Sequence, residues 1–121
     1  MRLLVVDDNP LNLELFEGAL ADDGHEVVVA SDGDAGLARA LAEPFDVVLL
    51  DVQLPGRDGM ELCRELRKAG RTGPILAVSA NALPDQVARG LDAGFDQYLT
   101  KPISPHTLCA VVRSYDQAPL P

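Results

Sequence analysis

The amino-acid sequence predicts an α/β fold in which a doubly wound, five-stranded parallel sheet carries helices on both faces. Short apolar, β-branched runs recur along the chain, and stretches with the spacing of amphipathic helices lie between them. The runs are apolar throughout and do not alternate with polar residues, as expected of strands buried on both sides. Because a helix separates each strand from the next, the strands are joined by crossovers and run parallel.

The five expected strands are short. They correspond to the apolar runs at residues 3–6, 27–30, 47–50 and 75–78, and to a weaker run at 98–99. The first helix is expected to begin at Asn9, a good N-cap, followed by Pro10 at the first helical position. Pro44 ends a second, Ala-rich helix over residues 35–43. Gly24 and Gly94 suit the left-handed residue that follows a helix.

The remaining helices are indicated by apolar residues at helical spacing. These residues are Leu62, Cys63 and Leu66 in the third helix, Leu83, Val87 and Leu91 in the fourth, and Leu108, Val111, Val112 and Tyr115 in the fifth. The phenylalanines and Met60 are expected in the core, and Gly59 at a tight entry into the third helix. The basic side chains of Arg64, Arg67, Lys68 and Arg71 are expected to be solvated near a helix end.

Length and composition indicate one domain. The chain has 121 residues, 47% of them hydrophobic, and we expect a domain over residues 1–115 followed by a tail or linker at 116–121. A net charge of −9 argues against direct binding to nucleic acid or to acidic membranes. The longest apolar run, residues 108–112, is far shorter than the ~20 residues that span a bilayer. Cys63 and Cys109, with no CxxC pair, are expected to be reduced core thiols of a cytoplasmic protein.

Polar residues follow four of the five expected strands, and ligands of an open parallel sheet bind beyond the carboxyl ends of its strands. The residues are Asp7 and Asp8 after the first strand, Asp51 after the third, Ser79 after the fourth, and Thr100 and Lys101 after the fifth. Helix capping explains any one of them, but Asn9 already suits the cap of the first helix. The set therefore indicates a common pocket.

Three carboxylates in one pocket need positive charge beside them. Two unit charges 4 Å apart repel by roughly 4 kcal/mol at an effective dielectric of about 20. Clustered carboxylate oxygens suit Mg²⁺, and Lys101, one of two lysines in the chain, supplies a second positive charge. A carboxylate nucleophile, Mg²⁺, a lysine and the hydroxyl of Ser79 are the groups that phosphoryl transfer to a carboxylate requires. The predicted product is an aspartyl phosphate.

The motifs, taken in order, resemble those of response-regulator receiver domains of bacterial two-component signalling over residues 2 to about 115. They are the acidic pair Asp7-Asp8, Asp51 in VVLLDVQLPGRDG, Ser79 in VSANA, and the string from Tyr98 to Pro102, YLTKP. The resemblance implies a flavodoxin-like (βα)5 fold with strand order 2-1-3-4-5. The DDNPLN string is similar to receivers of hybrid histidine kinases and to some stand-alone single-domain regulators.

The resemblance also implies the metal ligands. Asp51 is the phosphoacceptor and, with Asp8 and the backbone carbonyl of Gln53, would ligate Mg²⁺ directly, with Mn²⁺ as a substitute. Asp7 would act mostly through water. The phosphodonor would be a phosphohistidine on a histidine kinase or a histidine phosphotransfer protein.

The remaining implied roles concern the phosphoryl group and the switch. Lys101 would pair with the phosphoryl group, Ser79 would hydrogen-bond to it, and Tyr98 would change rotamer as Ser79 moves. The Lys101–Pro102 peptide bond is expected to be cis. The face formed by the fourth helix (84–92), fifth strand and fifth helix would switch and be read by a downstream protein, in a monomer or in a weak dimer through that face.

The implied function is a signalling module with intrinsic autophosphorylation and autodephosphorylation, not a metabolic enzyme. Two other classes remain as alternatives. A phosphatase of the haloacid dehalogenase type needs a second Asp two residues after the nucleophile, where this chain has Gln53. A flavodoxin needs a Ser/Thr-rich phosphate loop after the first strand, where Asp7 and Asp8 would repel the flavin phosphate. Turnover of phosphomonoesters would favour the phosphatase, and a yellow bound chromophore would favour the flavodoxin.

Overall fold

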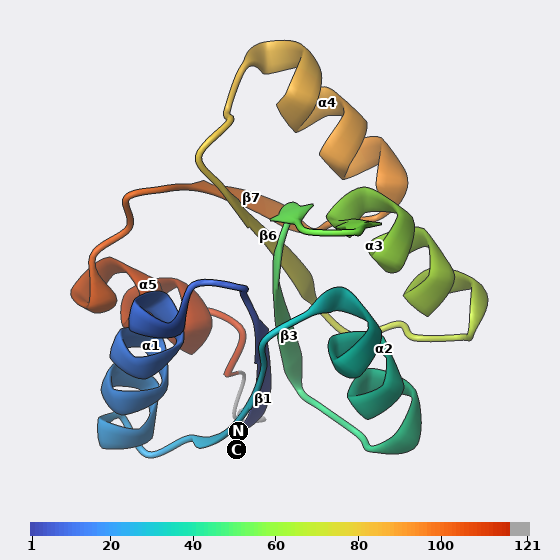
Figure 1. The fold of residues 1–121 in the computed structure, drawn as a ribbon. Helices are drawn as coiled ribbons and strands as arrows, with labels where there is room; N and C mark the ends of the chain where they lie inside the picture. The colour runs from blue at the N-terminus through green and yellow to red at the C-terminus, as the bar shows by residue number, and fades with distance from the viewer. Residues whose placement is uncertain (117–121) are drawn as a thin grey trace, which may run out of the picture.

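Five parallel strands form the central sheet, in the spatial order β2-β1-β3-β6-β7 (Figure 1). Counted along the chain, these five strands have the order 2-1-3-4-5, which confirms the predicted topology. The computed structural model describes residues 1–116, so the expected tail at 116–121 lies outside the described residues except for Asp116. The strands are β1 (Arg2–Val6), β2 (Glu26–Ala30), β3 (Val47–Asp51), β6 (Ile75–Ser79) and β7 (Gln97–Thr100).

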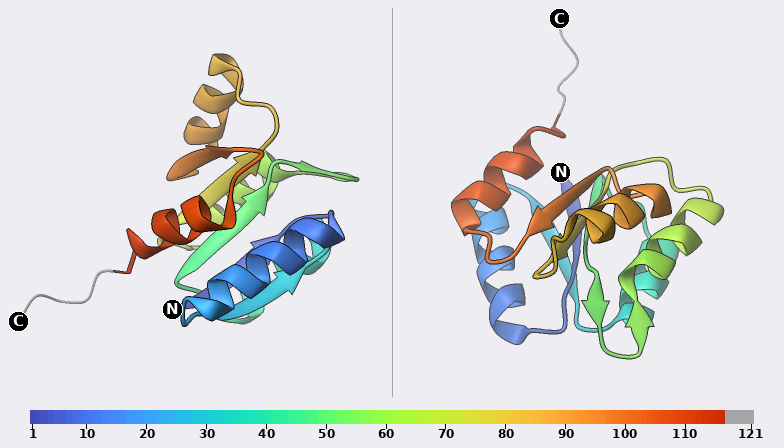
Figure 2. Two further views of the ribbon diagram at one scale, coloured as in Figure 1. Left: turned by 90° about the vertical axis from the view of Figure 1, so that its left-hand side faces the viewer. Right: turned by 90° about the horizontal axis from the view of Figure 1, so that it is seen from above.

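The helices pack in two layers. One layer contains α1 (Pro10–Asp22) and α5 (Pro105–Arg113), and the other contains α2 (Gly33–Ala42), α3 (Gly59–Lys68) and α4 (Pro84–Ala93) (Figures 1 and 2). Asn9 caps α1 with Pro10 at the first position, and Gly24 and Gly94 have positive φ, as predicted. Helix α2 begins two residues earlier than expected because the Asp32 side chain caps it, accepting a 2.7 Å hydrogen bond from the Ala35 amide.

The strands are buried on both faces, as their unbroken apolar runs predict. Successive residues of β1 point to opposite sides: Leu3 packs in the layer of α1 and α5, and Leu4 in the layer of α2, α3 and α4. Phe16 lies in the first of these cores, and Phe45 and Phe95 in the second. Cys63 and Cys109 are buried free thiols. Among the described residues, no helix has the length and apolarity needed to span a bilayer.

The structure contains a two-stranded hairpin between β3 and α3 that the sequence analysis did not predict. It consists of β4 (Gln53–Leu54) and β5 (Arg57–Asp58), and it projects beyond the carboxyl end of β3 (Figure 2). Two-residue strands are too short to show a periodic pattern. Gly59, directly after the hairpin, makes the expected tight entry: a Cβ there would lie 2.6 Å from the Asp51 carbonyl oxygen.

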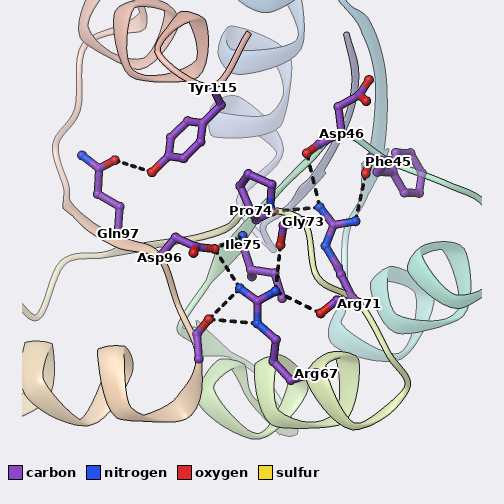
Figure 3. Close-up of polar contacts among 11 residues, drawn as sticks. Phe45, Asp46, Arg67, Arg71, Gly73, Pro74, Ile75, Asp96, Gln97 and Tyr115 are labelled. Carbon is purple, nitrogen blue, oxygen red and sulfur yellow. Dashed lines mark hydrogen bonds and ion pairs between the residues drawn. The ribbon is translucent and has the colours of Figure 1, made fainter. Parts of the chain in front are cut away.

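The expectation that Arg67 and Arg71 are solvated is wrong. The Arg67 guanidinium donates to the Gly94 carbonyl at 2.7 and 3.0 Å and to the Asp96 carboxylate at 2.7 Å (Figure 3). It also donates to the Arg71 and Gly73 carbonyls, and Arg71 in turn donates to the carbonyls of Phe45, Asp46 and Pro74. The two arginines satisfy loop carbonyls at the amino ends of the strands. Arg64 and Lys68, by contrast, are exposed as expected.

Candidate functional site

The parallel register brings the expected site residues to one edge of the sheet. Val6 is aligned with Leu50 across β1 and β3, so Asp7 and Asp51 follow neighbouring strand positions. Ser79 is aligned with Thr100 across β6 and β7, one residue before Lys101. The side chains of Asp7, Asp51 and Lys101 meet here, although they come from three different strand ends.

Asp7, Asp8 and Asp51 form an acidic cluster. Each offers one carboxylate oxygen, and the three oxygens lie within 4.8 Å of one another. Asp7 and Asp51 are 2% and 4% exposed, whereas Asp8 is exposed to solvent. A set of hard carboxylate oxygens with one open side fits Mg²⁺, which retains several waters and takes only one or two carboxylates from a protein. The donor chemistry thus fits the predicted ion.

The Asp51 carboxylate is held from two directions. Its Oδ1 accepts a 2.9 Å hydrogen bond from the Gln53 amide, and its Oδ2 accepts one of 2.9 Å from Lys101 Nζ. Lys101 Nζ also lies 3.0 Å from Asp7 Oδ2. The Lys101 backbone amide donates to the Ser79 carbonyl at 2.8 Å, and the Lys101–Pro102 peptide bond is cis, as predicted.

Burial and charge act in opposite directions in this cluster. Burial raises the pKa of Asp51, and the charge of Asp7 adds to the rise, against the lowering effects of Lys101 and of the Gln53 amide. Burial lowers the pKa of Lys101, but its hydrogen bonds to Asp51 and Asp7 outweigh burial and leave that pKa raised. The cluster therefore favours positive charge, and burial makes the ionised form of the Asp51 carboxyl less favourable than it would be in water.

Ser79 and Tyr98 are connected through the backbone of Asn81. The Ser79 side chain is fully buried, and its Oγ accepts a 3.0 Å hydrogen bond from the Asn81 amide. The Tyr98 hydroxyl donates to the Asn81 carbonyl at 2.5 Å. The Tyr98 ring lies against α4 at Gly90, where a Cβ would come within 2.9 Å of it. In this structure Tyr98 is therefore already tied to the loop that precedes α4.

A family model described as the response regulator receiver domain matches residues 3–113. The chain belongs to this family.

Relatives of this receiver domain include sensors and regulators. It is 42% identical over 116 residues to the sensor histidine kinase GacS of Pseudomonas protegens, covering 92% of this chain and 13% of GacS. It is 41% identical over 123 residues to the transcriptional regulatory protein TcrA of Mycobacterium tuberculosis, covering 100% of this chain and 48% of TcrA. The chain thus spans half or less of these curated relatives.

Solved receiver structures share the fold. A CheY-like receiver domain protein from Methanospirillum hungatei superposes with a TM-score of 0.89 at 31% identity, covering 95% of this chain and 93% of that one. The chemotaxis response regulator CheY4 of Vibrio cholerae superposes with a TM-score of 0.88 at 31% identity, covering 94% and 97%.

Two residues of this receiver domain, Asn12 and Asn81, contact predicted site residues without having been predicted to do so, and a third, Arg57, anchors the hairpin that follows Asp51. Asn12 Nδ2 donates to Asp7 Oδ2 at 3.4 Å. Asn12 is the second Asn of the DDNPLN string, which is the sequence signal for this contact. Asn81 makes its contacts to Ser79 and Tyr98 through its backbone, so no side-chain pattern marks it. Arg57 bridges the hairpin to α2 and α3 through charged partners far apart in the sequence.

Proposed function

We propose that Asp51 of this receiver domain accepts a phosphoryl group from a phosphohistidine, in a reaction that depends on Mg²⁺. One observation carries the proposal: at the carboxyl edge of the sheet, the buried Asp51 carboxylate contacts the Lys101 ammonium and belongs to one cluster with the carboxylates of Asp7 and Asp8. A nucleophile, a cation and an oxygen-rich metal site are the parts that phosphoryl transfer needs.

In the proposed reaction an Asp51 carboxylate oxygen forms the new P–O bond while the P–N bond of the phosphohistidine breaks, and the imidazole leaves. Lys101 releases Asp51 and pairs with the incoming phosphoryl oxygens. Ser79 exchanges its contact with the Asn81 amide for one in which its hydroxyl donates to the phosphoryl group. Lys101 already contacts Asp51, and the Lys101 backbone amide donates a hydrogen bond to the Ser79 carbonyl.

Asp8, Asp51 and the backbone carbonyl of Gln53 would hold Mg²⁺ directly, with Asp7 acting through water and Mn²⁺ able to substitute. When bound, the ion would offset negative charge on the phosphoryl oxygens. Two observations support this ligand set: the three carboxylate oxygens are clustered, and the Gln53 backbone amide donates a hydrogen bond to Asp51.

The proposed output is a change in the surface formed by α4, β7 and α5. Movement of Ser79 would break its contact with Asn81, and Asn81 also holds the Tyr98 hydroxyl. Within residues 1–116, no side chain caps the amino end of helix α4, so this end is the easier one to displace. A downstream protein, or a second copy of the domain in a weak dimer, would read the altered surface.

The cellular setting completes the proposal. A histidine kinase or a histidine phosphotransfer protein would be the phosphodonor, in the cytoplasm, and the domain would end near residue 115, just after α5. It would act as a signalling module that catalyses its own phosphorylation and dephosphorylation. Direct binding of nucleic acid or membranes is not part of the proposed role, in keeping with the net charge of −9.

Phosphorylation by acetyl phosphate tests the proposal. Intact-mass spectra should show one phosphoryl adduct that requires Mg²⁺ or Mn²⁺ and that is absent in Asp51→Asn. Asp8→Asn should melt at a higher temperature than the parent without metal, because one of three repelling charges is gone, and should lose the Mg²⁺-induced shift. An adduct that persists in Asp51→Asn would refute the assignment of the acceptor.

Amide NMR with beryllofluoride tests the switch. This phosphoryl mimic should shift resonances at the site and across residues 80–105. Shifts confined to the neighbours of Asp51 would exclude the route through Asn81 and Tyr98 and leave the acceptor assignment intact.

A further inference from the structure

Arg57 ties the hairpin that follows Asp51 to two helices. One arm of its guanidinium, Nη1, lies 3.1 Å from Asp34 Oδ1 at the start of α2, and the other arm, Nη2, pairs with the Glu65 carboxylate on α3. A planar guanidinium with two forked arms is suited to hold two carboxylates at once. The side chain therefore links β5, α2 and α3.

The aliphatic part of the Arg57 side chain is also closely packed. It lies over Gly33 in the first turn of α2, where an added Cβ would come within 2.8 Å of the Arg57 Cβ and 3.0 Å of Leu62. The Arg57 Nε is buried and has no hydrogen-bond partner among the described residues. The Arg57 stem thus packs between the two helices, while its side chain is 28% exposed and the partner side chains of Asp34 and Glu65 are 78% and 47% exposed.

The hairpin carries this constraint to the acceptor site. Arg57 is aligned with Leu54 across the hairpin, and Gln53 comes next, aligned with Asp58. The Gln53 amide donates to Asp51 Oδ1 at 2.9 Å, and the Gly59 amide closes the loop by donating to the Val52 carbonyl at 3.0 Å. The position of the Gln53 backbone is therefore coupled to the anchor at Arg57.

We propose that Arg57 is a positioning residue for the metal site: by clamping the β4–β5 hairpin to α2 and α3, it holds the Gln53 carbonyl where Mg²⁺ takes it as a ligand. This inference rests on the proposed function, because that function supplies Gln53 as a ligand. Loss of a group that hydrogen-bonds directly to a metal ligand changes metal affinity by about 10- to 100-fold. Arg57 would act less directly, through the hairpin that carries the ligand.

Electrostatics and positioning predict opposite results for loss of Arg57. Removing a positive charge near a cation site should, by Coulomb's law alone, tighten Mg²⁺ binding. Loss of the clamp should weaken it. We expect Arg57→Ala and Arg57→Gln to weaken Mg²⁺ binding by roughly 3- to 10-fold, a smaller effect than that of a direct second partner of a ligand. Arg57→Lys keeps the charge but not the fork, and should lie between these variants and the parent.

Titration calorimetry with MgCl₂ on the full chain measures the effect without any phosphorylation. Arg113→Ala is the matched control: it also removes one positive charge and an Arg–Asp pair, that of Arg113 with Asp23, which links α5 to the end of α1. It should leave the affinity for Mg²⁺ unchanged. Far-UV circular dichroism establishes that each variant is folded, and Arg57→Gln, which keeps most of the stem, provides a second variant should Arg57→Ala not fold.

The two failures are distinguishable. If the parent chain binds no Mg²⁺, or if Asp51→Asn binds it equally well, the proposed function fails. If the parent binds Mg²⁺ through Asp51 and folded Arg57→Ala or Arg57→Gln binds it as tightly or more tightly, the positioning role of Arg57 is overturned and the proposed function stands. A purely structural arginine would lower the melting temperature and leave the affinity unchanged.

Discussion

Lys101 and Asp51 are 50 residues apart in the chain, and Lys101 Nζ lies 2.9 Å from Asp51 Oδ2. The same ammonium lies 3.0 Å from Asp7 Oδ2. Without metal, Lys101 is therefore the cation that balances two buried carboxylates. The lysine that would later pair with the phosphoryl group has a structural role before phosphorylation.

Replacing Lys101 by Met should destabilise the metal-free domain by about 2 kcal/mol, because two buried carboxylates lose their counter-charge. Mg²⁺ should restore part of this loss, since it brings positive charge to the same oxygens. Urea unfolding with and without Mg²⁺ measures both effects. Lys68→Met, at the only other lysine and exposed on α3, is the control and should change stability little. Equal stability of the two variants would remove Lys101 from this role.

Replacing Arg67 by Ala should cost about 3 kcal/mol. The change leaves the carbonyls of Gly94, Arg71 and Gly73 without their donor (Figure 3), and hydrogen bonds to charged groups contribute roughly 1.5–3 kcal/mol each, not additively. Arg64→Ala, at an exposed position on the same helix, should fall within about 0.5 kcal/mol of the parent. Similar unfolding midpoints in urea for both variants would contradict the structural role assigned to Arg67.

Replacing Gly90 by Ala tests the packing of Tyr98. Alanine normally gains about 1 kcal/mol over glycine inside a helix, but a Cβ at Gly90 would lie 2.9 Å from the Tyr98 ring. We expect no gain in stability, a displaced ring in NMR spectra and an altered response to beryllofluoride. Gly18→Ala in α1 is the control, because a Cβ there would meet no atom of the described part of the chain within 4 Å. It should stabilise the domain; if Gly90→Ala stabilises it equally, Tyr98 is not held at this position.

Burial raises the pKa of the Cys63 thiol from 9.0 to about 11. The folded state therefore holds the thiol proton more tightly than the unfolded state, and this contribution to stability is complete below pH 9 and lost as the pH rises through 11. In Cys109→Ser, which isolates Cys63, an aromatic disulfide reagent at pH 8 should react only after denaturant is added. Rapid labelling of the folded variant would show that Cys63 is accessible.

The sequence was sufficient for the parts of the site that depend on side-chain identity and strand position. Asp7, Asp8, Asp51 and Lys101 follow predicted strands, and the carboxyl ends of parallel strands meet at one edge. Any chain with these strands in the order 2-1-3-4-5 brings these residues together, which explains why their meeting could be predicted without coordinates. Their assigned roles in catalysis and metal binding remain predictions.

By itself, the sequence determined the α/β class and the helix ends at Asn9 and Gly94, because periodicity and capping act over a few neighbouring residues, and the ordered motifs were enough to indicate the family. Only the tertiary structure decided what Arg57, Arg67 and Asn81 do. Arg67 and Asn81 act on or through backbone groups, and every residue carries the same backbone carbonyl and, proline apart, an amide. Arg57 pairs with Asp34 and Glu65, and the sequence does not indicate which of the 19 acidic residues of the chain would be its partners. Which groups approach one another is set by how the helices and loops pack, and no local pattern records that packing.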